Sequence, residues 1–510
     1  MRRSSWFMLM LLAAAPLWPA RAQVPEAPQF RVERMHVPGR ILSVHAQDLD
    51  GNGRRDLIVI WVSGTPEATK RHIGLFFDRG NGGAGFRENS DQDIAVPAGA
   101  AFLSVADLDG DGKRELVLGN SHGLSGLALD AQGNYGSPRP FATVEGVVLP
   151  PDEEALPFLD VARDWGGDGR VEFLLPLLEG IAVITRGADG RWSKTSELEL
   201  PPRPGYLVRD DLYEPRSRNF SLRIALTVPE MTLGDFDGDG RRDLIAVVDD
   251  LVTVFRGEPK GGLFAVMPIA RIHLGVRTTA EAARGNALVQ VSVLDFDGDG
   301  IVDLVVNKVV GGLQSMHAQT GFYLGRKGGG FDRPLQVMAR EGFAGSLAFA
   351  DVDGDRRPDL IMPYTHIGFA EAARILLTRR LSVGFEVHRN LGPKGFNNNA
   401  DVVRPVDFPV DYSAGVEIDA PLPTLDGDFN GDGVVDFAAG KSPDTLGVWL
   451  GGGKQLVTEY PKALVHVPAS RYWQVLDLDG DRHSDILLFY RHRSALEGQL
   501  VVLRNTRRGW

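Results

Sequence analysis

Apolar residues occur along this chain in short runs, which acidic and glycine-rich segments separate. In the first repeat the runs are Ile41–Ala46, Leu57–Val62, Ile73–Phe77 and Phe86–Val96, with a glycine-rich turn at Gly80–Gly85. Runs of this length that are rich in β-branched and aromatic residues and bounded by Gly and Asp are typical of strands. Four such strands make up a propeller blade. The pattern therefore predicts an all-β protein built from four-stranded blades.

A nine-residue acidic segment lies between the first and second strand of each repeat. Its clearest copies are Asp235–Asp243 and Asp295–Asp303, and the eight copies begin at residues 48, 107, 164, 235, 295, 351, 428 and 477. Their spacing averages about 61 residues, and a regular period of this size indicates a propeller or another repeat array. We expect a single propeller of eight blades; seven blades with one extra repeat is the alternative.

The clearest copies have carboxylates at positions 1, 3, 5 and 9 and glycines at positions 4 and 6, and the other copies vary this pattern. Four carboxylates so close together repel one another, and calcium binds six to eight oxygen atoms of this kind. An EF-hand would need a Glu at position 12, where this chain has Val59, Ala246 or Asn307. The sequence therefore predicts calcium-binding loops between strands, with the carbonyl oxygen at position 7 as a further ligand.

The expected calcium ligands can be given segment by segment; the residue at position 7 would contribute its backbone carbonyl oxygen and the other residues their side chains. They are Asp48, Asp50, Asn52, Arg54 and Asp56; Asp107, Asp109, Asp111, Lys113 and Glu115; Asp164, Asp168 and Glu172; Asp235, Asp237, Asp239, Arg241 and Asp243; Asp295, Asp297, Asp299, Ile301 and Asp303; Asp351, Asp353, Asp355, Arg357 and Asp359; Asp428, Asn430, Asp432, Val434 and Asp436; and Asp477, Asp479, Asp481, His483 and Asp485. In the third segment Gly166 replaces an acid, so we expect weak binding or none. Arg356 and Arg482 replace the glycine at position 6, and we expect these two loops to be distorted.

These repeats resemble the FG-GAP/VCBS repeats of integrin α-subunit propellers and of many secreted bacterial proteins. The resemblance implies that the acidic loop joins the first two strands of a blade and binds calcium. Unlike an integrin, the chain has the loop in all eight repeats and has no Phe-Gly…Gly-Ala-Pro string, so an integrin-like partner is not implied.

The two ends of the chain suggest how the ring closes. Only two strands, Ile486–Tyr490 and Leu500–Leu503, follow the eighth acidic segment, whereas a spare strand, Phe30–Val37, precedes the first repeat. We expect this amino-terminal strand to complete the last blade. Residues 23–510 would then form one propeller domain.

The amino terminus has the features of a signal peptide. Arg2 and Arg3 precede an apolar segment, Trp6–Leu17, and Ala20-Arg21-Ala22 has the form of a cleavage site. We expect residues 1–22 to be removed on export to the periplasm or the medium, by the Sec or the twin-arginine route; an uncleaved anchor is the alternative. No later stretch is long enough to span a bilayer.

Composition narrows the possible partners. The chain has no cysteine, so it has neither disulfides nor thiolate metal sites, and its 67 acidic and 55 basic residues give a net charge of −12. Because many of these acids belong to the predicted calcium loops, the charge indicates metal sites and does not favour nucleic acid as a ligand.

In an up-and-down blade the acidic loops and the glycine-rich turns share one face, and the remaining connections share the other. The longer insertions belong to these remaining connections, so we expect a glycan or protein to bind on that second face. These segments are roughly Pro201–Glu230, Gly275–Asn286, Lys308–Thr320, Tyr364–Glu371 and Asn390–Pro421. Aromatic and amide groups suit sugars, and arginines suit carboxylates. The candidates are Tyr206, Arg209, Tyr213, Arg218, Arg277, Arg284, Tyr364, His366, Asn397, Asn398, Asn399, Arg404 and Tyr412. The same segments could simply cap the central channel.

The chain has no Gly-x-Ser-x-Gly elbow, cysteine nucleophile or His-Glu-x-x-His motif, and we identify no catalytic residues. A binding or adhesion module is therefore the main hypothesis. The alternative, a polysaccharide-active enzyme, rests on a fold-level analogy, because eight-bladed calcium propellers include rhamnogalacturonan-type lyases; the chain has no recognisable lyase motif. A third hypothesis is a structural part of an envelope complex.

Overall fold

The computed structural model describes residues 28–510 apart from short internal gaps. The gaps are residues 66–67, 81–84, 147–154, 202, 208–222, 259–262, 279, 282–286, 312–315, 345–346, 366–368, 379, 412–416, 419–423, 453–455 and 492–493. The expected signal peptide lies outside the described residues. No helix within the described residues is both long and apolar enough to cross a membrane.

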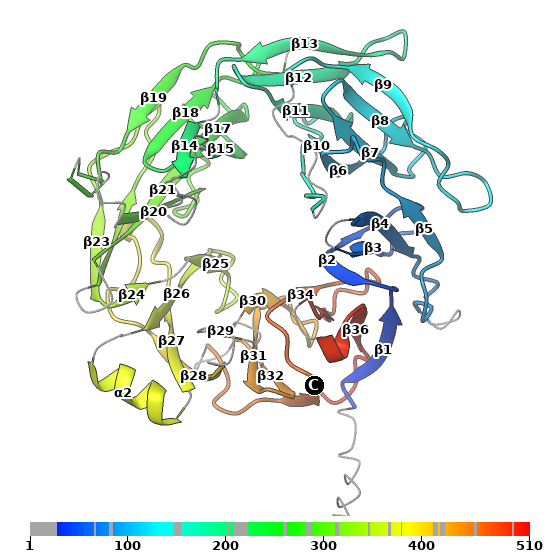
Figure 1. Cartoon of the computed structure of the whole chain (residues 1–510). Helices are drawn as coiled ribbons and strands as arrows, with labels where there is room; N and C mark the ends of the chain where they lie inside the picture. Colours follow the sequence, from blue (N-terminus) through cyan, green and yellow to red (C-terminus); the bar gives the residue numbers. More distant parts are fainter. Residues whose placement is uncertain are drawn as a thin grey trace, which may run out of the picture.

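The described strands form eight antiparallel blades around a central axis, each with a four-stranded core (Figure 1). From the inside outwards, blades 1 to 4 are β2 (Arg40–Gln47), β3 (Asp56–Ser63), β4 (Lys70–Phe76) and β5 (Gln92–Ala95); β6 (Phe102–Ala106), β7 (Glu115–Asn120), β8 (Gly123–Leu127) and β9 (Arg139–Thr143); β10 (Ala162–Arg163), β11 (Glu172–Pro176), β12 (Ile181–Arg186) and β13 (Trp192–Leu198); and β16 (Glu230–Gly234), β17 (Asp243–Val248), β18 (Leu251–Phe255) and β19 (Ala270–His273). Eight blades confirm the sequence-based prediction.

Blades 5 to 8 follow the same order. They are β20 (Ala287–Leu294), β21 (Asp303–Val310), β22 (His317–Tyr323) and β23 (Gln336–Glu341); β24 (Phe343–Ala344) and β25 (Ala348–Ala350), β26 (Asp359–Thr365), β27 (Arg380–His388) and β28 (Val402–Asp411), extended by β29 (Glu417–Ile418); β30 (Thr424–Gly427), β31 (Asp436–Ser442), β32 (Thr445–Trp449) and β33 (Ala463–His466); and β34 (Trp473–Leu476), β35 (Asp485–Phe489), β36 (Gln499–Asn505) and β1 (Phe30–His36). Outside the blades lie the hairpin of β14 (Arg203–Leu207) and β15 (Arg223–Thr227), the helix α2 (Phe369–Thr378) and two short 3-10 helices, Gly392–Lys394 and Ser494–Leu496.

The hydrophobic core is divided into clusters that lie between neighbouring blades. One cluster joins Ile58 and Ile60 of β3 to Leu116 and Leu118 of β7, and corresponding clusters fill the other contacts around the ring. The second strand of a blade is therefore covered on both faces. This explains why β3, the second strand of blade 1, is buried over Asp56–Val62 and is almost continuously apolar. Each blade is stabilised by its neighbours, and an open ring would expose apolar surface at both ends.

The amino-terminal strand closes the ring, as predicted. β1 pairs antiparallel with β36 over its whole length, with Phe30 opposite Asn505 and His36 opposite Gln499. Trp510 packs edge-on against Phe30, at a ring-centroid distance of 5.4 Å. The first and last strands of the described chain therefore share blade 8.

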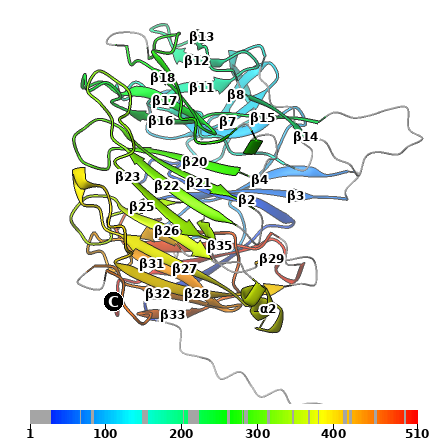
Figure 2. The ribbon, with the colours of Figure 1, turned by 90° about the vertical axis from the view of Figure 1, so that its left-hand side faces the viewer.

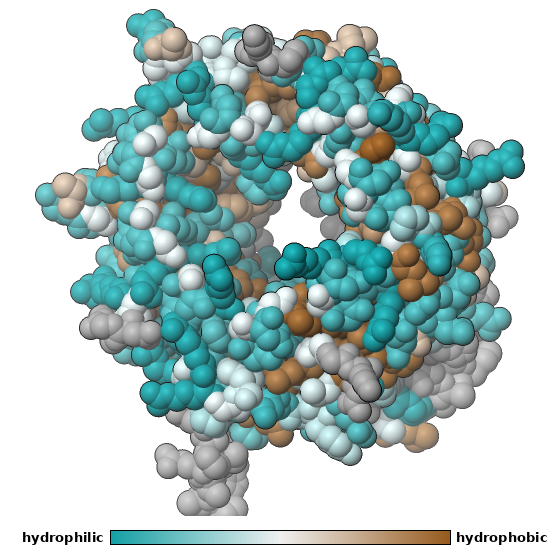
Figure 3. All heavy atoms as spheres, turned by 180° about the vertical axis from the view of Figure 1, so that it is seen from behind, coloured by the Kyte–Doolittle hydropathy of each residue, from teal (hydrophilic) through white to brown (hydrophobic). Residues whose placement is uncertain are grey.

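The two faces of the ring differ. The face with the loops between first and second strands, together with the turns between third and fourth strands, is called the acidic face. β14–β15, α2 and β29 project from the opposite side, called the insertion face (Figure 2). Figure 3 shows the acidic face, with predominantly hydrophilic residues and an opening at the centre of the ring.

The prediction that Asn390–Pro421 belongs to the insertion face is wrong for its first part. Asn390–Asn399 lie between β27 and β28, the third and fourth strands of blade 6, and hence on the acidic face. Arg404 lies on β28 and donates a hydrogen bond of 2.7 Å to the carbonyl oxygen of Val457 in blade 7. Because α2 lies between the second and third strands, β27 is the third strand of the blade, and the segment that follows it is the turn from the third strand to the fourth.

Of the other candidates on the insertion face, Arg277 donates to Asp249 at 3.0 Å and the Tyr364 hydroxyl donates to the carbonyl oxygen of Glu341 at 2.5 Å. Much of the predicted Lys308–Thr320 insertion lies in β21 and β22. Tyr206 lies on β14. Arg209, Tyr213, Arg218, Arg284, His366 and Tyr412 lie outside the described residues.

Candidate metal centres

The eight acidic loops share one backbone turn, which the aspartate at position 1 organises. In the loop of blade 4, Asp235 accepts hydrogen bonds from the backbone N–H groups of Gly238 and Gly240, both at 2.7 Å. The bond from position 6 recurs in all eight loops, at 2.7 to 3.0 Å. The third loop thus keeps the turn although Gly166 removes one expected ligand.

Position 6 has a positive φ, which normally requires glycine. Gly240 has a φ of 81°, and Arg356 and Arg482 adopt φ values of 69° and 68°. Both arginines still donate to the aspartate at position 1, at 2.7 and 2.9 Å. The expected distortion is therefore wrong: the turn is kept, and the cost is local backbone strain of about 1–2 kcal/mol per residue.

Position 5 is held in a similar way. Its side chain accepts a hydrogen bond from the backbone N–H of position 7 in every loop, at 2.7 to 3.0 Å. In the fifth loop the donor is Ile301 and the acceptor is Asp299. The polar side chains are thus positioned by backbone groups, independently of the residue type at position 7.

The carboxylate at position 9 is buried and fastens the loop to its blade. In every loop it accepts a hydrogen bond from the backbone N–H of position 2, at 2.6 to 3.1 Å. In six loops its other oxygen accepts a second bond from the backbone at the end of the third strand, at 2.7 to 2.9 Å. For Asp303 the two donors are Phe296 and Gly325.

Burial of these carboxylates disfavours their charged form. Desolvation raises the pKa of Asp56 and Asp485 to about 7 and that of Asp303 to about 6. In Asp56 and Asp303 the other acids of the loop add to this effect, while the backbone hydrogen bonds partly oppose it. A cation beside the carboxylate would offset the cost of keeping it charged.

The acids converge closely enough to hold a metal ion. In several loops three carboxylates each have an oxygen within 4.8 Å of the others; the sets include Asp48, Asp50 and Asp56; Asp107, Asp109 and Glu115; Asp235, Asp237 and Asp239; Asp295, Asp297 and Asp299; and Asp351, Asp353 and Asp355. Within the described residues, the buried Oδ1 of Asp237 has no hydrogen-bond partner. A donor set made only of oxygen atoms fits a hard cation such as calcium and does not favour a soft metal.

Arginine side chains also reach some of these loops. In the fourth loop Arg241 pairs with Asp239, and Arg256 lies 3.0 Å from Asp237. Arg357 and Arg389 pair with acids of the sixth loop, and Arg507 pairs with Asp481 of the eighth. No ion pair of the described residues reaches the acids at residues 107–115 or 295–303. The loops therefore differ in how much cationic charge the protein itself supplies.

Neighbouring loops are joined through their backbones. The N–H at position 8 of several loops donates to a carbonyl oxygen at position 1 or 2 of the preceding loop; the pairs are Arg55–Leu478 at 2.7 Å, Arg114–Leu49 at 2.9 Å, Val302–Asp235 at 2.9 Å, Val435–Asp351 at 3.3 Å and Ser484–Asp428 at 2.7 Å. The acidic loops thus form part of the contact between blades.

The side-chain amides of Asn390 in blade 6 and Asn505 in blade 8 also join neighbouring acidic loops. The sequence analysis missed both residues as links between loops. The Nδ2 of Asn390 donates to the carbonyl oxygens of Phe296 in loop 5 and Pro358 in loop 6, at 2.7 and 3.0 Å. The Nδ2 of Asn505 does so to Phe429 and Ser484 at 2.8 and 3.2 Å. The detectable signal was an Arg-Asn pair at the end of the third strand in both blades.

Cavities lie between blades on the acidic face. One, of about 530 Å³, is lined by residues that include Asp107, Asp109, Arg170, Arg186 and Trp192. Another, of about 560 Å³, lies beside the first loop and is lined in part by Asp50, Asn52 and Arg54. The sequence analysis had predicted ligand binding on the opposite face, the insertion face.

A comparison with known protein families agrees with this architecture. A family profile described as FG-GAP-like repeat matches residues 48–118, 235–306 and 295–362. No curated protein matches the chain.

Among solved structures, an Agrocybe aegerita lectin that recognises non-reducing terminal N-acetylglucosamine is 14% identical, with a TM-score of 0.39 over 72% of this chain and 80% of that one. Candidate 6-phosphogluconolactonases from Bacteroides fragilis and Bacteroides uniformis are 12% and 11% identical; both have a TM-score of 0.33, and they match over 83% and 80% of this chain and 98% and 95% of their own. The matched repeats and the ring of eight blades with an acidic loop in each identify this chain as an FG-GAP repeat β-propeller protein.

Proposed function

We propose that the protein is a secreted or periplasmic calcium-binding propeller that serves as a binding module for a glycan or a protein. The observation that carries the calcium part is the convergence of three carboxylate oxygens within 4.8 Å in loop after loop. FG-GAP repeats commonly bind calcium, and the oxygen donor set suits that ion.

Calcium in these loops would stabilise the folded ring. The acids of a loop are held together in the folded chain but not in the unfolded chain, so an ion that binds only the folded state contributes its binding free energy to stability. The residues at positions 1, 3, 5 and 9 and the carbonyl oxygen at position 7 would hold it. Since the same loops join neighbouring blades, the ion would also strengthen the contacts between blades.

The test of calcium binding is calorimetric titration of chelator-treated protein, together with its melting temperature. We expect several calcium equivalents to bind and the melting temperature to rise with calcium concentration. Magnesium should act more weakly, because it requires stricter octahedral geometry. As a control, Asp189→Asn removes an exposed carboxylate outside the loops and should bind calcium and melt like the parent. A melting temperature that is the same in excess EDTA and in calcium would rule the proposal out.

The ligand is to be sought with a panel of polysaccharides and calcium-loaded protein, scored for co-sedimentation and for new chain ends. A rigid ring with variable connections on one face and cavities between blades on the other is a scaffold suited to binding. We expect retention without cleavage. Release of new chain ends would support the polysaccharide-active alternative, and absence of both signals would favour a protein partner.

Export is tested separately by the mass of the protein recovered from the periplasm or medium. A mature amino terminus at Gln23 is expected. An intact Met1–Ala22 segment would contradict cleavage.

A further inference from the structure

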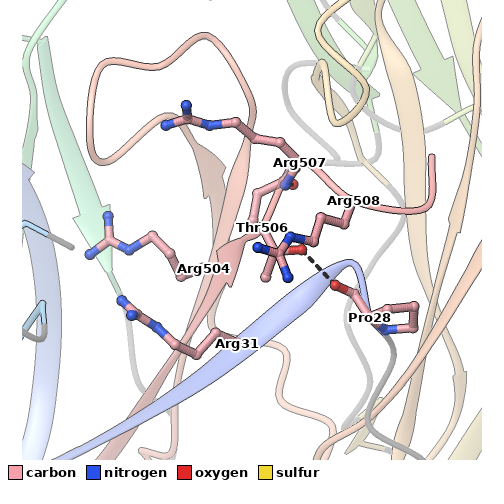
Figure 4. Close-up of a pocket in the computed structure, with 7 residues that line it drawn as sticks. Pro28, Arg31, Arg504, Thr506, Arg507 and Arg508 are labelled. Atoms are coloured by element: carbon pink, nitrogen blue, oxygen red, sulfur yellow. Dashed lines mark hydrogen bonds between the residues drawn. The ribbon is translucent and has the colours of Figure 1, made fainter.

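Four arginines line a cavity where the first and last described segments meet on the acidic face (Figure 4). The cavity has a volume of about 400 Å³ and is lined by Pro28, Arg31, Arg504, Asn505, Thr506, Arg507 and Arg508. We refer to it as the arginine cavity. It lies beside the eighth acidic loop, because Arg507 pairs with Asp481 of that loop.

The fold places these arginines together at some cost. Arg31 and Arg504 are directly opposite each other in the β1–β36 register, and like charges opposite each other on paired strands are destabilising. The Thr506 hydroxyl donates to the carbonyl oxygen of Pro28 at 2.5 Å and so ties the two chain segments together.

Five carboxylates balance these charges in the present arrangement. Arg31 pairs with Glu33 at 2.5 Å. The buried guanidinium of Arg504 has three carboxylate neighbours, namely Asp78 at 2.9 Å, Asp485 at 3.5 Å and Glu33 at 3.6 Å. Its Nη2 is not aligned for a hydrogen bond with any of them.

Arg507 completes this set of ion pairs. It reaches Asp481 and lies 4.0 Å from Asp479, whereas exposed Arg508 is in no ion pair within the described residues.

Three of the five carboxylates, those of Asp479, Asp481 and Asp485, are expected ligands of calcium in the eighth loop. A bound calcium ion would add two positive charges beside the arginines and engage the oxygen atoms of these three carboxylates, which would then compete less for Arg504 and Arg507. The ion thus removes the excess of negative charge around the cavity and leaves guanidinium groups available, which recognise oxyanions with paired hydrogen bonds.

We propose that the arginine cavity binds an oxyanion, either a free ion such as sulfate or a carboxylate of an acidic sugar, and that calcium in the eighth loop strengthens this binding. The inference rests on the proposed calcium binding. It places an anion site on the acidic face, away from the insertion face.

The test is calorimetric titration of the calcium-loaded full chain with sodium sulfate, with oligogalacturonate and with a neutral galactose oligomer. We expect sulfate, oligogalacturonate or both to bind, and the neutral oligomer not to bind. A stronger signal with oligogalacturonate than with sulfate identifies the acidic sugar as the source of the oxyanion, and the reverse identifies the free ion.

The double variant Arg31→Ser/Arg508→Ser should lose at least about tenfold in affinity, equivalent to about 1.4 kcal/mol. Arg191→Ser, which removes an exposed arginine outside the cavity, should bind like the parent. Equal affinity of the double variant and the parent, with equal melting temperatures, would overturn the proposal.

Calcium titration of the same samples separates this inference from the proposed function. If calcium binds but neither sulfate nor oligogalacturonate does, the anion site is wrong and calcium binding stands. Affinity unchanged in EDTA or in Asp479→Asn would overturn the link to the eighth loop. Absence of calcium binding would overturn both.

Discussion

The backbone N–H of Arg55 in the first acidic loop donates a hydrogen bond of 2.7 Å to the carbonyl oxygen of Leu478 in the eighth. This bond crosses the junction at which the ring closes, next to the pairing of β1 with β36. The acidic loops therefore do more than collect carboxylates, because they also hold blades together. Changes in one loop should weaken its neighbour as well as itself.

The two kinds of carboxylate in a loop should respond differently to calcium. Asp303→Ala removes a buried side chain that accepts two backbone hydrogen bonds, so we expect a loss of about 2–4 kcal/mol in the free energy of unfolding even in EDTA. Asp299→Ala, at an exposed position, should be nearly neutral in EDTA and destabilising in calcium. Denaturant unfolding under both conditions measures this, and equal losses in EDTA would contradict the anchoring role of position 9.

Loops should also differ in their contribution to calcium-dependent stability. Asp239→Ala removes a ligand from a loop with acids at positions 1, 3, 5 and 9, whereas Asp168→Ala acts on a loop in which Gly166 has already replaced one. We expect the first variant to lower the melting temperature in calcium by more than the second. Equal decreases would show that the third loop binds calcium as well as the fourth.

Replacing a strained arginine should stabilise the protein. Arg356→Gly removes a side chain from a residue with a φ of 69°, and we expect a gain of up to about 1 kcal/mol in the free energy of unfolding, because the left-handed conformation suits glycine. Gly433→Ala is the matched reverse change: its φ is 83° and a Cβ would meet nothing within 4 Å. It should cost a similar amount; a neutral result for both variants would contradict the strain.

His45 should contribute to the loss of stability in acid. Its ring stacks on Phe158 at 4.2 Å, and burial lowers the pKa of its imidazole to about 4. The unfolded chain takes up the proton near pH 6.5, so stability falls as pH drops from 6.5 to 4, by at most about 3 kcal/mol from this residue. In His45→Gln the difference in unfolding free energy between pH 7.5 and 4.5 should be smaller than in the parent. An unchanged difference would show that His45 is protonated in the folded state.

Much of this architecture could be predicted from the sequence because its determinants are local and repeated. The spacing of the acidic segments gave the number of blades, and the spare strand at Phe30–Val37 gave the closure. The glycines at positions 4 and 6 predicted the turn, since a positive φ is a property of single residues. The signal peptide and the bound calcium remain predictions.

Tertiary structure decided what depends on residues far apart in the chain. Only the pairing of β27 with β28 places Asn390–Asn399 on the acidic face, and only the folded ring brings Asn505 to the carbonyl oxygen of Phe429. The arginine cavity likewise needs Arg31 and Arg504 from opposite ends of the chain. A sequence pattern records which groups recur, whereas the charge that surrounds each group depends on distances that only the closed ring determines.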